Sequence, residues 1–245
     1  MAIPIKYKIL ASILSIILAQ CNSKSIPSNC QDLEVRIVNE NPSKSLKGQK
    51  FYYESDNSGY SSGLTGGQFS ILMTGPQPIQ WGYEGPGQEL TLVESSKTER
   101  GCYVIELVRP AGAMLKATDT GRYVAKYVSN PEVTRSVYLY VPNKYPPFLL
   151  NTETLQTASW TEGKALVLPC LLNDPTMKVA FSKRSGLNEW KEVQNVGTYS
   201  PQTGFTIRKP FGSFNSLYGS YKCFTKLHNR NDTVFITVGP EEISY

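Results

Sequence analysis

The sequence predicts an all-β protein made of two β-sandwiches in tandem, and three observations support this fold class. From Leu33 to Tyr245 the chain consists of short runs rich in Val, Ile, Tyr, Phe and Thr, separated by Gly, Asn, Asp, Ser and Pro. Such runs are typical of the strands and tight turns of a sandwich or barrel. Long helix-period patterns are absent. The 245-residue chain has room for two domains of ordinary size, and a proline-rich segment divides it.

The N-terminus has the pattern of a signal peptide over residues 1–21. Lys6 and Lys8 form a short basic region, an apolar run follows, and Ala19 and Cys21 have the spacing that signal peptidase needs. A membrane anchor is the alternative, but the run is shorter than the roughly 20 apolar residues that span a bilayer. A bacterial lipoprotein signal is a second alternative, which Gln20 fits badly. We therefore expect a secreted, extracellular protein whose mature chain does not insert into a membrane.

The domain boundary is expected at the proline-rich segment 142–147. The run 137–141 has the composition of a final strand, and the three prolines that follow stop the sheet and stiffen the connection. We expect the first domain over residues 28–142 and the second over residues 147–240. Each has about 100 residues, the usual size of an immunoglobulin domain.

The second domain carries the two features that identify an immunoglobulin-like sandwich. Leu166, Leu168 and Cys170 alternate with residues of the opposite face, and Tyr221 and Cys223 also share one face. The two cysteines are 53 positions apart, which fits a disulfide between two sheets about 10 Å apart. A tyrosine two residues before the second cysteine fits a tyrosine corner. We therefore expect a Cys170–Cys223 disulfide that stabilises the domain by roughly 3–4 kcal/mol.

The first domain repeats the tyrosine corner without the disulfide. Asp119, Gly121 and Tyr123 form the D-x-G-x-Y pattern of a tight turn that enters a strand. Ala125 occupies the position of the expected cysteine, and counting forward from the preceding glycine places its partner near Ser55. The sequence therefore predicts that both ends of the inter-sheet disulfide are replaced by small side chains.

Three cysteines remain outside this pair. Cleavage after Cys21 leaves an even number of cysteines, whereas cleavage after Ala19 leaves a free thiol. Cys30 and Cys102 are expected to pair and to tie the start of the chain to a middle strand, although spacing alone does not establish the bond. Trp81 is either the core tryptophan of the first domain or a surface residue.

Composition argues against catalysis, metal sites, cofactors and nucleic-acid binding. His228 is the only histidine and lies in a polar, turn-like stretch, and no ligands cluster at metal-binding spacing. The formal charge is +5, but no dense run of Lys and Arg forms a basic face, which leaves a weak heparin-like contact as an alternative. Asn231 begins an N-x-T sequon and is predicted to be glycosylated, with an unmodified turn asparagine as the alternative.

Three segments carry a resemblance to a receptor family: LPCLLNDP at 168–175, YSPQTGFTI at 199–207 and VYLYVP at 137–142. The first two resemble the second immunoglobulin domain of the platelet-derived growth factor, macrophage colony-stimulating factor and stem-cell factor receptors. The GFTI stretch is also similar to that of the vascular endothelial growth factor receptors. The third resembles the junction between the first and second domains. The resemblance covers roughly residues 137–238 and is weaker over the first domain.

The resemblance implies the ligand-binding part of such a receptor without a kinase. The expected function is a secreted protein that binds a dimeric growth factor or cytokine, as a soluble receptor or decoy. A cell-adhesion or matrix-binding immunoglobulin protein is the alternative. Aromatic side chains often anchor protein interfaces, so the candidate contact residues near the linker and loops are Tyr145, Phe148, Trp160 and Trp190. Packing between the two domains is the alternative role for each of them.

Overall fold

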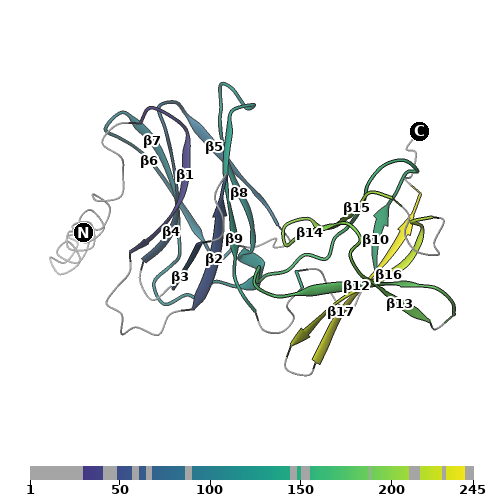
Figure 1. Ribbon diagram of the computed structural model, residues 1–245. Coiled ribbons are helices and arrows are strands. Elements are labelled where there is room, and N and C mark those ends of the chain that lie inside the picture. Colours follow the sequence, from purple (N-terminus) through teal and green to yellow (C-terminus); the bar gives the residue numbers. More distant parts are fainter. Residues whose placement is uncertain are drawn as a thin grey trace, which may run out of the picture.

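The computed structural model describes residues 30–40, 49–56, 61–64, 68–85, 90–143, 148–149, 155–187, 189–209, 216–227 and 230–240. The predicted signal peptide, Tyr145 and His228 lie outside these residues. The fold is all-β, as predicted: strands β1–β9 form one sandwich and strands β10–β17 form a second beside it (Figure 1). The predicted limits 28–142 and 147–240 remain predictions, because the segment that joins the two sandwiches is only partly described.

The first sandwich contains a four-stranded and a five-stranded antiparallel sheet. In sheet order, the four-stranded sheet has β1 (Glu34–Glu40), β4 (Gln68–Gly75), β7 (Cys102–Val108) and β6 (Val93–Glu99). The five-stranded sheet has β3 (Ser61–Leu64), β2 (Lys50–Ser55), β9 (Thr134–Tyr140), β8 (Gly121–Tyr127) and β5 (Ile79–Glu84). A short 3-10 turn, η1 (Ala117–Asp119), leads into β8. In β8 every second residue is buried, as expected of a strand with one face on the core.

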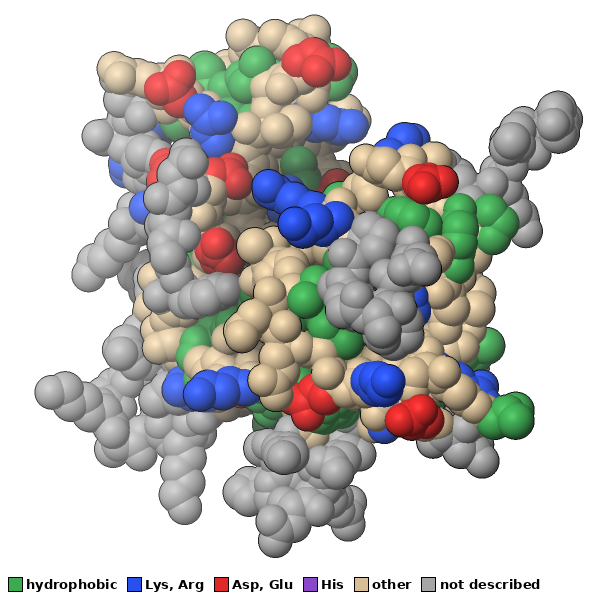
Figure 2. All heavy atoms as spheres, turned by 45° about the vertical axis from the view of Figure 1, so that its right-hand side comes forward, with side chains coloured by type: hydrophobic (Ala, Val, Ile, Leu, Met, Phe, Trp, Pro, Cys, Tyr) green, Lys and Arg blue, Asp and Glu red, His purple; other side chains and the backbone are tan. Residues whose placement is uncertain are grey.

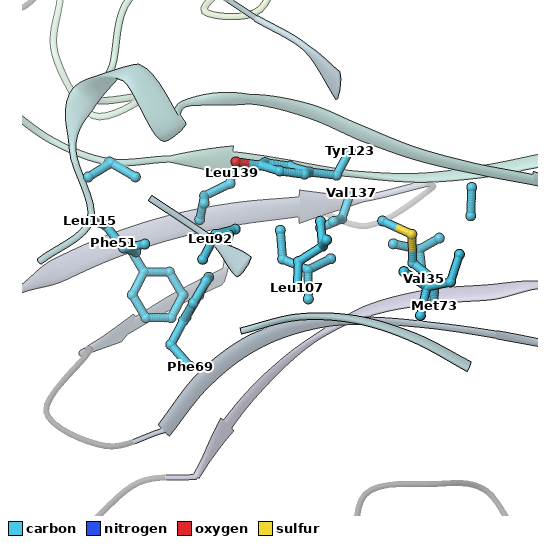
Figure 3. Packing of buried hydrophobic residues seen from close by; sticks show 14 of the residues in the cluster. Val35, Phe51, Phe69, Met73, Leu92, Leu107, Leu115, Tyr123, Val137 and Leu139 are labelled. Carbon is cyan, nitrogen blue, oxygen red and sulfur yellow. The ribbon is translucent and has the colours of Figure 1, made fainter. Parts of the chain in front are cut away.

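The core of the first sandwich fills the space between its two sheets (Figure 3). Phe51 and Phe69 meet edge to face, with ring centroids 4.9 Å apart. Leu107 and Leu139 come from opposite sheets and are both fully buried. Trp81 packs against this core, and its indole Nε1 donates a hydrogen bond to Glu94 at 2.9 Å. Trp81 is therefore a partly buried residue that joins the edges of the two sheets.

The second sandwich contains a five-stranded and a three-stranded sheet. In sheet order, the larger sheet has β10 (Gln156–Ser159), β17 (Arg230–Gly239), β16 (Gly219–Leu227), β12 (Val179–Arg184) and β13 (Trp190–Val193). The smaller sheet has β11 (Leu166–Leu168), β15 (Gly204–Ile207) and β14 (Thr198–Ser200). Strand β10 runs parallel to β17, and the other pairs are antiparallel.

Both expected disulfides are present. Cys170 and Cys223 are fully buried between the sheets of the second sandwich, with Cα atoms 5.9 Å apart. Cys30 and Cys102 join the start of the described chain to the first residue of β7, with Cα atoms 5.6 Å apart. Both separations suit an ordinary disulfide.

Both sandwiches have the hydrogen bond of a tyrosine corner. The Tyr123 hydroxyl donates to the backbone carbonyl of Asp119 at 2.8 Å, and the Tyr221 hydroxyl donates to that of Leu217 at 2.7 Å. Gly121 is required by space in the first corner, because a Cβ atom there would lie 2.6 Å from the Tyr83 ring. The D-x-G-x-Y pattern is thus explained by the turn, by the close approach and by the hydrogen bond.

The predicted position of the missing disulfide partner is wrong. Ser55 lies at the end of β2, in the same sheet as Ala125, so the two cannot face each other across the sandwich. Counting forward along the sequence arrives at β2, because the hairpin β2–β3 precedes β4 in the chain. This hairpin pairs with β9 and does not belong to the opposing sheet. The opposing strand is β4, whose core-facing residues include Ile71 and Met73. Large apolar side chains, and not a second small one, therefore occupy this part of the core.

Candidate functional site

The described residues hold no cluster of three or more potential metal ligands. Within the same part of the chain, no helix is long and apolar enough to cross a membrane.

Two of the predicted contact residues are core side chains. Phe148 is 3% exposed and Trp160 is 5% exposed, and both belong to the core of the second sandwich. The Trp160 indole donates a hydrogen bond to the carbonyl of Lys164 at 2.8 Å, and its ring meets Tyr218 at 4.8 Å between centroids. The prediction that Phe148 and Trp160 anchor a partner does not hold, because their rings are covered by the chain itself.

Trp190 lies on an accessible surface. It is half-buried in β13, and its ring centroid is 5.9 Å from that of Phe235 in β17, a side chain that is 41% exposed. The Lys222 ammonium lies 5.0 Å from the Trp190 centroid, within the range of a cation–π contact. We call Trp190, Lys222 and Phe235 the outer aromatic surface.

Strand alternation places the outer aromatic surface on the outside of the five-stranded sheet. Lys222 lies between the buried Tyr221 and Cys223, and it pairs with Phe235 on the next strand. Phe235 in turn lies between the buried Val234 and Ile236. The sequence reasoning missed Lys222 and Phe235, although the period-two burial of their neighbours could have located both.

The hairpin between β12 and β13 extends this surface. Leu187 at its tip is 88% exposed. The Arg184 Nε donates to the carbonyl of Gly186 at 2.9 Å, and the same guanidinium donates to the carbonyl of Leu187. The backbone N–H of Ser185 donates to the carbonyl of Glu189 at 2.9 Å. These hydrogen bonds hold the described residues of the hairpin in place, which reduces the conformational entropy that binding would cost.

The junction of the two sandwiches is a second candidate surface, and its contacts are polar. The Gln202 side chain, in the turn between β14 and β15, donates to Glu54 at 2.9 Å and accepts from Arg122 at 3.0 Å. Tyr138 and Tyr140 lie beside it on β9 and are buried, although their alternation points them away from the core of the first sandwich. These contacts join residues 80 and 148 positions apart.

Charged side chains of both signs are interspersed on the face shown in Figure 2, without a continuous basic area. A concentrated basic face is what nucleic-acid binding usually requires. The predicted weak heparin contact gains no support from this face and remains a prediction.

Asn231 lies within strand β17, opposite Lys226, and not in the loop of the hairpin. We expect an N-linked glycan at Asn231 when the chain is secreted from eukaryotic cells, because the sequon is intact. Peptide mapping should then show aspartate at position 231 after enzymatic deglycosylation. Thr233→Ala removes the sequon while keeping Asn231 and should abolish the conversion. An unmodified Asn231 in the wild-type protein would contradict the prediction.

These sandwiches, with their tyrosine corners and disulfides, have the architecture of immunoglobulin-like domains. No family model matches the chain. The chain is 29% identical over 164 residues to the macrophage colony-stimulating factor 1 receptor of Danio rerio. That match covers 64% of this chain and 16% of the receptor, so the matched part is about one sixth of the relative's length.

Three solved structures are similar at low TM-scores. The N-terminal eight immunoglobulin domains of Down Syndrome Cell Adhesion Molecule are 14% identical, with 86% of this chain and 25% of that chain covered and a TM-score of 0.29. The neural ectodermal development factor IMP-L2 is 13% identical, with 85% and 95% covered and a TM-score of 0.28. An I-band fragment of titin is 12% identical, with 70% and 58% covered and a TM-score of 0.26. The fold assignment rests on the sheets described above and not on these likenesses.

Proposed function

We propose that the protein binds a secreted protein ligand, a dimeric growth factor or cytokine, outside the cell and acts as a soluble receptor or decoy. The observation that carries this proposal is the outer aromatic surface of Trp190, Lys222 and Phe235. Interfaces take most of their binding energy from a few residues, among which tryptophan is enriched. A disulfide-braced sheet presents these side chains with little loss of backbone entropy on binding.

The choice of ligand class rests on the resemblance at 137–238 and on the match to a macrophage colony-stimulating factor receptor. The match lies within 164 aligned residues and does not extend to the rest of that receptor. The mechanism is equilibrium capture: ligand bound to this chain leaves the free pool, and competing receptors respond to the remainder.

Affinity capture tests the ligand class. The mature chain is immobilised and exposed to the secreted proteins of the organism that makes it. Recovery of a dimeric growth factor or cytokine supports the proposal. Recovery only of further copies of the chain or of matrix proteins rejects it and supports the adhesive alternative.

Trp190→Ala is expected to weaken binding of the captured ligand by about 30-fold, because removal of an interface tryptophan typically costs about 2 kcal/mol. Titration calorimetry or surface plasmon resonance with the purified ligand measures the change. Tyr103→Ala is the matched control, since Tyr103 is an exposed aromatic residue on β7 of the first sandwich. Equal ligand affinities for the two variants would show that the outer aromatic surface is not part of the binding site.

A further inference from the structure

A hollow of about 530 Å³ lies between the two sandwiches. Glu84, Arg122 and Tyr138 line it from the first sandwich, and Leu149, Leu171 and Gln202 line it from the second. Its volume falls within the range of about 300–1,000 Å³ that is usual for binding sites. It is separate from the outer aromatic surface, none of whose three residues lines it.

The walls of the hollow are held in place by Gln202. The side-chain amide of Gln202 donates to Glu54 Oε2 at 2.9 Å, while its oxygen accepts from Arg122 Nη2 at 3.0 Å. The turn that carries Gln202 is itself ordered, because the backbone N–H of Gln202 donates to the Ser200 hydroxyl at 3.2 Å. The hollow is thus formed before a ligand enters, which lowers the cost of binding.

Arg122 gives the hollow its chemistry. Among the described residues its guanidinium donates one hydrogen bond, to Gln202, and its Nε lies 3.9 Å from Glu84 Oε2. Both side chains of that loose ion pair are well exposed, so it contributes little. A guanidinium has five N–H donors and binds an incoming carboxylate through two parallel hydrogen bonds.

The rest of the lining suits an apolar group next to that carboxylate. Leu149 and Leu171 face the hollow from the second sandwich, and Tyr138 faces it from β9. Arg122 is the only cation among the residues of its described lining, and Glu84 is the only anion. An anionic ligand group would replace Glu84 beside Arg122.

We propose that the hollow binds an acidic side chain and its apolar neighbour, carried on a protruding loop of the protein ligand. This inference rests on the proposed function and adds a second contact site to it. Arg122 binds the carboxylate, and Tyr138, Leu149 and Leu171 contact the apolar side chain. Glu84 competes with the incoming carboxylate for Arg122.

The test uses two short peptides and the full chain, so it does not depend on the natural ligand. Acetyl-Leu-Glu-amide and acetyl-Leu-Gln-amide are titrated while backbone amide shifts are recorded by NMR. We expect the acidic peptide to shift the amides of Arg122, Leu171 and Gln202 and to bind about 10-fold more tightly than the neutral one, since a charge-assisted pair is worth about 1.4 kcal/mol or more. Equal affinities, or no shifts at these residues, would overturn the proposal.

Two variants with opposite expected effects sharpen the test. Arg122→Gln should abolish the preference for the acidic peptide. Glu84→Gln should strengthen acidic-peptide binding about three-fold, by removing a competitor worth about 0.6 kcal/mol. The Glu84→Gln variant tests the carboxylate site even if Arg122→Gln perturbs the structure of the junction. Weaker binding of the acidic peptide by Glu84→Gln would contradict the proposal. Tyr103→Ala, at an exposed position on β7 away from the hollow, should leave peptide binding unchanged. The peptide titration does not use the natural ligand, so failure at the junction and failure of the proposed function are distinguishable.

Discussion

Replacing Cys170 and Cys223 together by alanine is expected to lower the free energy of unfolding of the second sandwich by roughly 3–4 kcal/mol. The disulfide closes a loop of 53 residues, so its loss enlarges the unfolded ensemble. Both cysteines are fully buried among the core side chains of this sandwich, so their shortening also removes packing. Urea unfolding followed by tryptophan fluorescence measures the change, because Trp160 and Trp190 lie in the second sandwich and only Trp81 reports on the first.

The first sandwich supplies a design for a matched variant. It has Ala125 where the second has Cys223, and Trp81 pairs with Ala125 as Phe181 pairs with Cys223. Cys170→Ile combined with Cys223→Ala should therefore lose less stability than the double alanine variant, because the larger side chain refills the core. A double alanine variant within 1 kcal/mol of the wild type would contradict a structural role for the bond.

Stability is expected to fall steeply as the pH rises above 10, because of the buried tyrosines. Burial raises the pKa of the Tyr123 phenol far above its ordinary value of 10.0, and the nearby Asp119 acts in the same direction. Burial also raises the pKa values of Tyr138 and Tyr221. Above pH 10 the unfolded chain loses these protons while the folded chain keeps them. Tyr123 alone should then cost about 1.4 kcal/mol of stability per pH unit.

The opposite shift of one lysine does not hide this fall. Burial lowers the pKa of Lys183, whose ammonium donates to the carbonyl of Ser216 and lies 5.3 Å from the Tyr221 centroid. A lowered lysine pKa makes stability rise with pH only up to the unfolded value of 10.5. Tyr123→Phe should reduce the slope above pH 10 by about 1.4 kcal/mol per unit, and Tyr103→Phe at an exposed position should not. Identical slopes for Tyr123→Phe and wild type in urea unfolding would contradict the assignment.

The local features of the fold were predictable from the sequence. Alternation located β16, which carries Cys223, and β11, which ends two residues before Cys170, and the D-x-G-x-Y pattern located the first tyrosine corner. Period-two burial shows which residues share a face, but it does not show which sheet a strand joins. The hairpin β2–β3 was therefore not distinguished from a core strand, and Ser55 was assigned to the wrong sheet.

The candidate sites were less predictable because they depend on tertiary placement. The size of Phe148 and Trp160 and their proximity to loops favour an interface role, yet the folded chain covers both. Phe235 lies 45 positions from Trp190 in the numbering, and only the sheet order brings their rings together. The contacts of Gln202 with Arg122 and Glu54 follow from the docking of two sandwiches, for which no local pattern exists.

The disulfide between Cys30 and Cys102 also makes the native structure depend on the redox conditions around the protein. Leu72 and Val104 form an apolar cluster on the outside of the four-stranded sheet, and Cys30 packs against it. Reduction of this disulfide would release Cys30 from the sheet. The apolar side chains of Leu72 and Val104 would then be exposed to water. We therefore expect a reducing environment to favour aggregation of the protein, whereas an oxidising environment keeps these apolar side chains covered.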